Sequence, residues 1–326
     1  MAVKSCGFAV GNLRARENTL LKQSDLIRFA SAKDVSELGA MLRDKGIGDQ
    51  ASNTSVPEML RYENEKLFKY LMDIAPDVSL FEPFLYENDF HNMKAVLKAV
   101  IKNTGYEKMI LSPSLIFPEL FEKAFSEKRF DILPDYVKST AEQAYSVITQ
   151  SGDPQLCDGI IDAGCMAAQT ERAKTADNRI ISDIIAVSVF YKNIKTALRA
   201  ARARKSADFL DKTVTETAYL KKERIVKAAL QGEDDVLELL STVTKAGGAA
   251  AAEYYRRSPS EFEKYVDDRI TAAAKNCKTV TLGVEPLIGY MLAKKSEIKD
   301  IRIIYSGIKT GADSEITTER LRELYG

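Results

Sequence analysis

The chain is 326 residues long, a length that accommodates two or three domains of ~100–150 residues each. Hydrophobic residues make up 45% of it and charged residues 29%, which is the balance of a soluble protein with a substantial core. The 47 Lys and Arg residues are matched by 47 Asp and Glu residues, and this zero net charge argues against a general nucleic-acid-binding protein.

No membrane span is expected either. The longest strongly apolar run, Ile184–Tyr191, is far shorter than the ~20 residues that a membrane-spanning helix needs, and the N-terminus lacks the apolar stretch of a signal peptide. The cysteines are widely spaced without a C-x-x-C pair, which is typical of a reduced cytoplasmic protein with cysteines in its core. They are Cys6, Cys157, Cys165 and Cys277.

Helical periodicity runs through most of the chain. In two long segments the apolar side chains recur at steps of three and four, so each set lies on one face of a helix. The first set comprises Phe90, Met93, Val96, Leu97, Val100 and Ile101, and the second comprises Val187, Phe190, Tyr191, Ile194, Ala197, Leu198 and Ala201. Because clean period-two alternation is nearly absent, we predict an all-α fold.

Loops and helix starts interrupt this pattern. Breaks are predicted at Gly46–Pro57, Ser112–Pro113 and Ser151–Pro154 from their Gly, Pro, Ser and Asn content. The small-residue run Ala246–Ala252 is predicted either to pack closely on another helix or to form a connector.

Two late helices carry recognisable start signals. Ser258 is predicted to be an N-cap, with Pro259 at the first helical position and Glu261 at the third. A second helix is predicted to start at Pro286, directly after Glu285, because proline lacks the N–H that a first-turn position leaves unpaired.

Two short patterns recur three times in the same order. The first reads FHNMKAVL at 90–97, YKNIKTAL at 191–198 and IKDIRIIY at 298–305, and it aligns Asn92, Asn193 and Asp300. The second reads SAKDVSEL at 31–38, SEKRFDIL at 126–133 and GEDDVLEL at 232–239. In the second pattern Ser31, Ser126 and Gly232 are predicted to be N-caps, followed by Asp34, Glu127 and Glu233 in the first turn.

Because both patterns keep their order and nearly keep their separation, the chain is predicted to contain three copies of one helical unit of about 100 residues. The predicted domains are residues 1–107, 108–205 and 206–326.

Residues that commonly carry catalysis are scarce. His91 is the single histidine, and we predict that it faces solvent or an interface. The sequence contains no G-x-x-x-x-G-K-[ST] phosphate loop. The G-x-G-x-x-A match at 46–51 follows a helical pattern rather than a strand, so it is predicted to be a loop. Cys157 and Cys165 have no histidine nearby, which argues against zinc. We therefore expect no catalytic residue, cofactor or metal.

Four segments resemble one known family. They are FAVGNLRARENTLL at 8–21, FLYENDFHNMKAVLKA at 84–99, VEPLIGYMLAKKSEIKDIRIIYSGI at 284–308 and ERLRELYG at 319–326. In these segments the chain resembles the C subunit of V-type (V/A-type) ATPases, which is termed the d subunit in eukaryotes. Gly289 and Lys295 depart from the pattern, since the resemblance leads us to expect Ala and Glu there.

The resemblance implies three similar helical domains arranged as a funnel or socket on the cytoplasmic side of the membrane rotor ring. It further implies a non-catalytic central-stalk connector. Such a connector receives the rotor shaft, which the D and F subunits form, and transmits torque between shaft and ring, for proton or sodium transport or for ATP synthesis.

A basic helix face recurs in all three predicted copies although the net charge is zero, and we expect these faces to form a partner interface. They comprise His91, Lys94 and Lys98 in the first copy, Lys192, Lys195 and Arg199 in the second, and Lys299 and Arg302 in the third.

Two alternatives remain open from the sequence. One is a helical-repeat scaffold that binds an unrelated soluble protein, and its gene would not lie beside those of the ring and head proteins of an ATPase. The other is a helical enzyme that uses carboxylates outside any recognised motif, which would require a closed polar pocket with carboxylates of shifted pKa.

Overall fold

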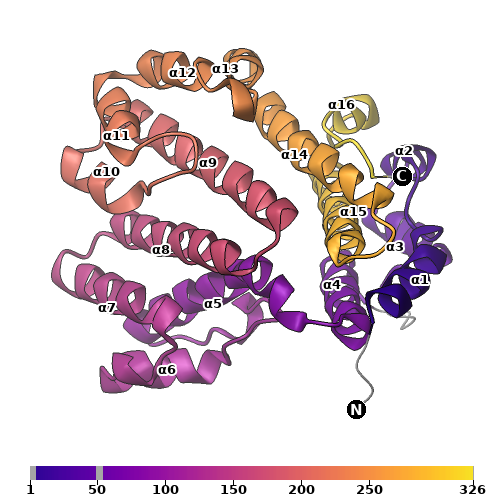
Figure 1. Cartoon of the computed structure of the whole chain (residues 1–326), viewed down its shortest axis with the longest axis horizontal. Coiled ribbons are helices and arrows are strands. Elements are labelled where there is room, and N and C mark those ends of the chain that lie inside the picture. The colour runs from indigo at the N-terminus through magenta and orange to yellow at the C-terminus, as the bar shows by residue number, and fades with distance from the viewer. Residues whose placement is uncertain (1–4, 49–53, 326) are drawn as a thin grey trace. The chain divides into compact units, whose positions relative to one another are not determined.

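The computed structural model describes residues 5–48 and 54–325, and these ranges contain helices and no strand (Figure 1). The prediction of an all-α fold is therefore confirmed. Within the same ranges, no helix combines the length and the apolar character that crossing a membrane requires.

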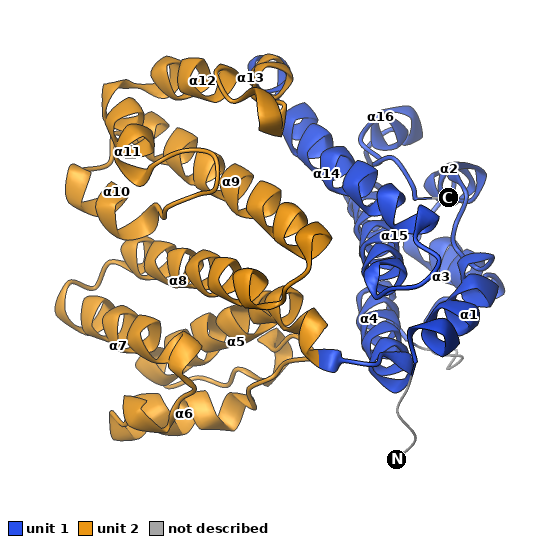
Figure 2. Ribbon diagram, in the orientation of Figure 1, with its two compact units in different colours: residues 1–78, 254–326 blue, residues 79–253 orange. Residues whose placement is uncertain are grey.

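The chain folds into two compact units, which Figure 2 shows in different colours. Unit 1 combines residues 1–78 with residues 254–326, and unit 2 comprises residues 79–253. The two units are defined by the contacts within each of them, whereas the predicted copies at 1–107, 108–205 and 206–326 are defined by a repeated order of helices. The division into three copies therefore stays a prediction.

Unit 1 is organised around its longest helix, α15 (Glu285–Thr310), which packs against α1, α2, α3, α4, α14 and α16. Its core includes Phe29, Leu42, Met59 and Ile301, all of which are almost completely buried. The other helices of the unit are α1 (Cys6–Glu17), α2 (Gln23–Ala30), α3 (Val35–Asp44), α4 (Val56–Ile74), α14 (Pro259–Lys275), η5 (Asn276–Thr279) and α16 (Ser314–Glu319).

In unit 2, α8 (Pro154–Thr175) packs against α5, α7, α9 and α10, while α11 and α12 pack on α9. The helices are α5 (Glu82–Lys102), η2 (Glu107–Met109), α6 (Pro118–Glu127), η3 (Phe130–Ile132), α7 (Asp135–Gln150), α9 (Arg179–Arg202), α10 (Ala207–Thr213), α11 (Lys222–Gln231), α12 (Glu233–Ser241) and η4 (Thr244–Ala246). Two elements, η1 (Val78–Phe81) and α13 (Gly248–Arg257), cross the boundary between the units.

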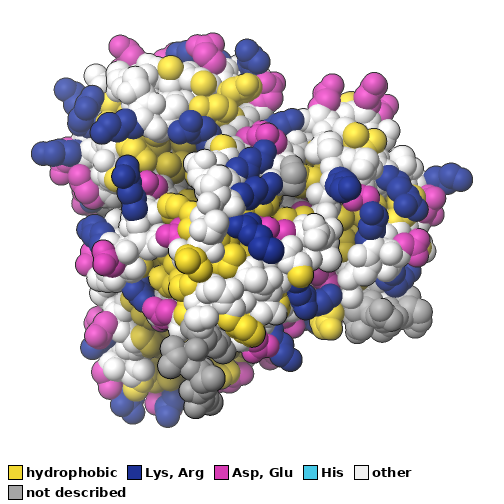
Figure 3. Space-filling view, turned by 45° about the vertical axis from the view of Figure 1, so that its right-hand side comes forward, with side chains coloured by type: hydrophobic (Ala, Val, Ile, Leu, Met, Phe, Trp, Pro, Cys, Tyr) yellow, Lys and Arg dark blue, Asp and Glu magenta, His cyan; other side chains and the backbone are white. Residues whose placement is uncertain are grey.

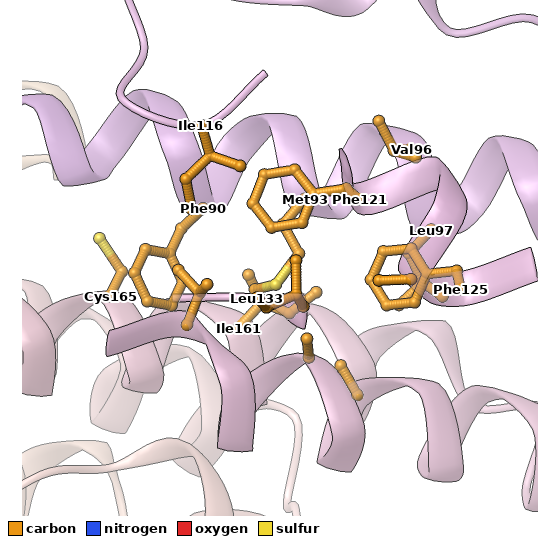
Figure 4. Close-up of a cluster of buried hydrophobic side chains, with 14 of the residues drawn as sticks. Phe90, Met93, Val96, Leu97, Ile116, Phe121, Phe125, Leu133, Ile161 and Cys165 are labelled. Atoms are coloured by element: carbon orange, nitrogen blue, oxygen red, sulfur yellow. The ribbon is translucent and has the colours of Figure 1, made fainter. Parts of the chain in front are cut away.

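The core of unit 2 forms where α5 meets α8. Phe90 and Met93 of α5 lie against Ile161 and Cys165 of α8 (Figure 4). The predicted apolar face of α5 therefore points into the core, except that Ile101 near its end is 43% exposed. The predicted face of α9 is buried at its centre in the same way, from Phe190 to Leu198.

Three of the four cysteines confirm the prediction that they belong to the core. Cys157, Cys165 and Cys277 are buried, whereas Cys6 in the first turn of α1 is only partly buried.

The predicted helix starts agree closely with the structure. Helix α14 begins at Pro259, and the hydroxyl oxygen of its N-cap Ser258 accepts a hydrogen bond from the Glu261 N–H at 3.1 Å. Helix α15 begins at Glu285, one residue earlier than predicted, so that Pro286 takes the second position, where no intrahelical partner for an N–H exists either.

The predicted breaks are found between helices. Ser151 is the C-cap of α7 and Asp153 the N-cap of α8, and the bond between Ser112 and Pro113 lies in the connection from α5 to α6. In the predicted loop 46–57, residues 49–53 lie outside the described part of the chain, and α4 begins at Val56, so Pro57 belongs to its first turn.

Two of the N-caps predicted from the second repeated pattern are wrong. Ser31 is the C-cap of α2, and Asp34 caps α3 instead, because its carboxylate accepts the Glu37 N–H at 2.9 Å. Ser126 lies inside α6, since that helix continues past the buried Phe125 until Lys128 takes a left-handed conformation.

Of the remaining assignments from this pattern, one is wrong and two are confirmed. Glu127 is the last residue of α6 rather than a first-turn acid. Gly232 does cap α12, and Glu233 is in the first turn as predicted. Each copy of the pattern lies at a junction between two helical segments, so what the copies share is their apolar spacing rather than a common cap.

Two glycines stand where chain segments approach closely. A Cβ on Gly248 would lie 1.9 Å from the Leu240 carbonyl oxygen, so the small-residue run does pack closely on a neighbour. A Cβ on Gly289, where we expected Ala, would lie 2.7 Å from the Cβ of Cys277 and 2.9 Å from the Tyr325 hydroxyl. A side chain at this position would therefore meet η5 and the C-terminal segment, which both pack on α15.

Candidate functional site

The three aligned polar residues occupy matching places. Asn92, Asn193 and Asp300 are completely buried within the long helices α5, α9 and α15. Each side-chain oxygen accepts a hydrogen bond from the backbone N–H of a segment that follows its helix. The partners are Leu111 at 2.8 Å, Thr215 at 2.7 Å and Arg322 at 2.9 Å, respectively.

The residues around each buried polar residue also recur. In every copy the residue before the buried one and the residue two places after it are basic or histidine, namely His91 and Lys94, Lys192 and Lys195, and Lys299 and Arg302. Each basic face is thus next to a buried polar residue that accepts a backbone hydrogen bond.

Five of the eight basic-face residues line one surface pocket of unit 2. The pocket has a volume of about 340 Å³ and lies between α5, α8 and α9. The basic residues in its lining are His91, Lys94, Lys192, Lys195 and Arg199, and the others include Glu87, Phe90, Asp162, Cys165 and Met166. The basic faces of the first two predicted copies therefore converge on one place, which we call the basic pocket.

Three lysines of these faces also hold helices together. Lys94 of α5 lies 2.8 Å from a carboxylate oxygen of Asp162, and Lys98 lies 2.7 Å from one of Asp158, so both connect α5 to α8. Lys192 forms an ion pair with Glu87 that connects α9 to α5. Burial alone would lower the pKa of Lys192, but the surrounding groups, with the Glu87 carboxylate foremost, together outweigh this effect, and the net pKa is raised.

The basic pocket has an excess of positive charge. Lys94, Lys192, Lys195 and Arg199 face the two carboxylates of Glu87 and Asp162, which leaves about two positive charges at neutral pH. This excess is local, because Lys and Arg side chains lie beside Asp and Glu side chains across the face of the molecule in Figure 3, with apolar side chains exposed between them.

The chemistry of the basic pocket favours binding over catalysis. His91 is exposed, as predicted, and its Nε2 lies 3.0 Å from the Met109 carbonyl oxygen. Burial raises the pKa of the Cys165 thiol to about 12, so the thiol stays protonated and is a poor nucleophile. The arrangement can attract carboxylates from a partner, and its apolar wall can contact their carbon atoms.

The other predicted residues lie elsewhere. Lys98 is one turn beyond Lys94 on α5 and does not line the basic pocket. Lys299 and Arg302 belong to unit 1, where the Lys299 ammonium lies 2.5 Å from a carboxylate oxygen of Asp267 and Arg302 is exposed. A partner-binding role for all eight residues stays a prediction.

Sequence reasoning missed the residues that α8 contributes. Asp158 and Asp162 are four residues apart and therefore share one helix face, opposite the lysines of α5. That spacing, together with the similar spacing of Lys94 and Lys98, was the available signal. Nothing local in the sequence, however, indicates that these two helices are neighbours.

The sequence matches known proteins over nearly its whole length. The family described as ATP synthase (C/AC39) subunit matches residues 9–320. The C subunit of the V-type sodium ATPase of Enterococcus hirae is 21% identical, over 96% of this chain and 97% of that protein. The C subunit of the A-type ATP synthase of Methanobrevibacter smithii is 24% identical, over 90% and 81%. The C subunit of the V-type ATP synthase of Thermus thermophilus is 21% identical, over 90% of each.

These matches confirm the resemblance to the C subunit, and they include helices α5 and α15, whose segments carried it. The chain belongs to the ATP synthase (C/AC39) subunit family.

Proposed function

We propose that this chain is a non-catalytic central-stalk component of a V/A-type rotary ATPase. It links the rotor shaft of the D and F subunits to the membrane rotor ring, from the cytoplasmic face, and transmits torque for ion transport or ATP synthesis. The observation that carries this proposal is the family match over residues 9–320, together with relatives that are each named as the C subunit of such a complex.

Transmission of torque requires stiffness, and the long helices provide it. Buried Asn92 and Asn193 attach α5 and α9 to the segments that follow them, and close-packed interiors have low compressibility. A load applied to one end of such a helix is passed on by packed side chains rather than absorbed by loops.

The basic pocket supplies a means of recognition. Its excess of positive charge would attract an acidic surface of the shaft or ring, and complementary charge mainly raises the association rate and fixes the register of the partners. Lys195 and Arg199 are the residues chosen to test this role, because both line the basic pocket one turn apart on α9 and Arg199 is exposed.

Reconstitution tests the proposal. Vesicles that contain the ring, the stator, the shaft and the ATP-hydrolysing head should show ATP-driven ion uptake only when this chain is added. Without it, hydrolysis should continue without uptake, and the isolated chain should hydrolyse no ATP. Uptake at the same rate in its absence would contradict the connector role, and hydrolysis by the purified chain would contradict its non-catalytic nature.

A further inference from the structure

A second polar pocket lies within unit 1 and plays no part in the function proposed above. Its volume is about 530 Å³, within the range of roughly 300–1,000 Å³ that is typical of small-molecule sites. It is bordered by the ends of α1 and α3, the segment before α2, and parts of α4 and α15. Its charged and aromatic lining residues are Arg16, Lys22, Asp25, Lys45, Glu63, Lys66, Tyr70, Tyr290 and Lys294.

The acids at this pocket are already engaged. Asp25 accepts the Lys22 N–H at 3.0 Å and pairs with Lys45 at 2.6 Å. Glu63 accepts the Gly48 N–H at 2.9 Å and pairs with Lys66 at 3.1 Å.

Behind the lining, a third acid is engaged in the same way. Glu297 accepts the Leu21 N–H at 2.7 Å and pairs with Lys294 at 2.7 Å. Each of the three carboxylates is thus satisfied by one backbone donor and one lysine.

Five cations therefore converge where three carboxylates are available. The two cations in excess are Arg16 and Lys22, which form no ion pair with any residue of the described part of the chain. The Arg16 guanidinium carbon lies over the Tyr70 ring at 4.1 Å from its centroid, a cation–π contact that holds this charge at the pocket. Like charges brought together in a partly enclosed site repel one another unless an anion joins them.

A further donor is available at this site. The Tyr70 hydroxyl is buried and has no hydrogen-bond partner among the described residues. Burial raises its pKa, so it remains protonated and able to donate.

We propose that this pocket binds a small ligand that carries a phosphate or diphosphate group. Two excess positive charges match the charge of such a group at neutral pH. The planar guanidinium of Arg16 can bind two phosphoryl oxygens at once, and Lys22 contributes a point charge beside it. This inference does not depend on the rotary function, because it concerns a small molecule and unit 1 alone.

Inorganic pyrophosphate is the probe that tests it, by calorimetric titration and thermal unfolding of the full chain at constant ionic strength. Saturable binding and a raised Tm are expected. Arg16→Gln combined with Lys22→Gln should weaken the affinity by roughly tenfold or more. Both residues are exposed, so the fold should persist, and circular dichroism would verify this; Lys22→Gln alone provides a milder variant.

The matched control is Arg28→Gln combined with Lys33→Gln, which removes the same charge from exposed positions of unit 1 outside the pocket and should leave the affinity unchanged. Three results would overturn the proposal. They are an absence of saturable binding, equal binding by the Arg16 and Lys22 variant, and an equal effect of sodium chloride or malonate at the same ionic strength.

Discussion

At the scale of single residues, the third copy of the buried polar position differs from the other two in carrying a carboxyl group. Burial raises the pKa of Asp300 to about 7, and the nearby acids Asp267 and Asp268 act in the same direction, while Arg322 opposes them. One oxygen of Asp300 accepts the Arg322 N–H, and the other is buried without a partner among the described residues. An amide such as that of Asn92 or Asn193 avoids the cost of burying a charge there.

This difference predicts a pH-dependent stability. Because the pKa of folded Asp300 lies above its ordinary value of 3.8, the folded state retains a proton that the unfolded chain loses. The stabilisation by that proton is complete below about pH 4 and is lost as the pH rises through about 7. The free energy of unfolding should therefore fall by roughly 1 kcal/mol between about pH 6 and about pH 8 in urea titrations.

Asp300→Asn should flatten that dependence, whereas Asp44→Asn, at an exposed position of the same unit, should retain it. The pKa of Asp89 is raised only to about 6, mainly by burial, so its contribution falls mostly below the tested window. If the Asp300→Asn protein kept the slope of the unchanged protein, the attribution to Asp300 would be wrong.

At the scale of elements, features set by local sequence patterns could be predicted, whereas features set by packing between distant segments could not. Periodicity of three and four identified the buried faces of α5 and α9, because a helix places such positions on one side whatever its neighbours are. The Ser258 cap was predictable for the same reason, since its partner lies three residues away. Ser126 misled because the packing of Phe125 extends α6 past the expected start.

The close contact at Gly289 gives a prediction about one element. Gly289→Ala should lower the free energy of unfolding by about 1–3 kcal/mol, because the added methyl group meets the Cβ of Cys277 and the Tyr325 hydroxyl in a filled space. Gly11→Ala, in α1 with nothing within 4 Å of the new Cβ, should be neutral or stabilise by up to ~1 kcal/mol. Equal effects of the two changes on urea-induced unfolding would show that packing does not explain Gly289.

At the scale of the whole molecule, the sequence predicted the family and the recurrence of basic faces, but not how those faces are brought together. That five of the basic residues line one pocket depends on α8 lying beside both α5 and α9, and no local pattern encodes this neighbourhood. The two compact units were not predicted either. Unit 1 joins segments from both ends of the sequence, and the N-terminal helices pack there on α15 near the C-terminus.

The role proposed for the basic pocket can be tested by charge reversal. Lys195→Glu combined with Arg199→Glu should slow association with the shaft or ring by roughly tenfold at low salt, with a smaller difference at high salt, because screening weakens steering. Lys123→Glu combined with Lys227→Glu makes the same charge change at exposed positions outside the basic pocket and should have little effect. Association rates would be measured by surface plasmon resonance. Similar rates for the two double variants would contradict a binding role for the basic pocket and would indicate that it is only a solvent-exposed charged surface.

A bridging assay measures directly whether this chain joins the shaft to the ring. The shaft, assembled from the D and F subunits, is immobilised, detergent-solubilised rotor ring is passed over it, and the retained ring is quantified with and without the purified chain. Retention should require the chain and rise with its concentration until the shaft is saturated. Retention of the ring without the chain, or binding of the chain to neither partner, would contradict this joining role.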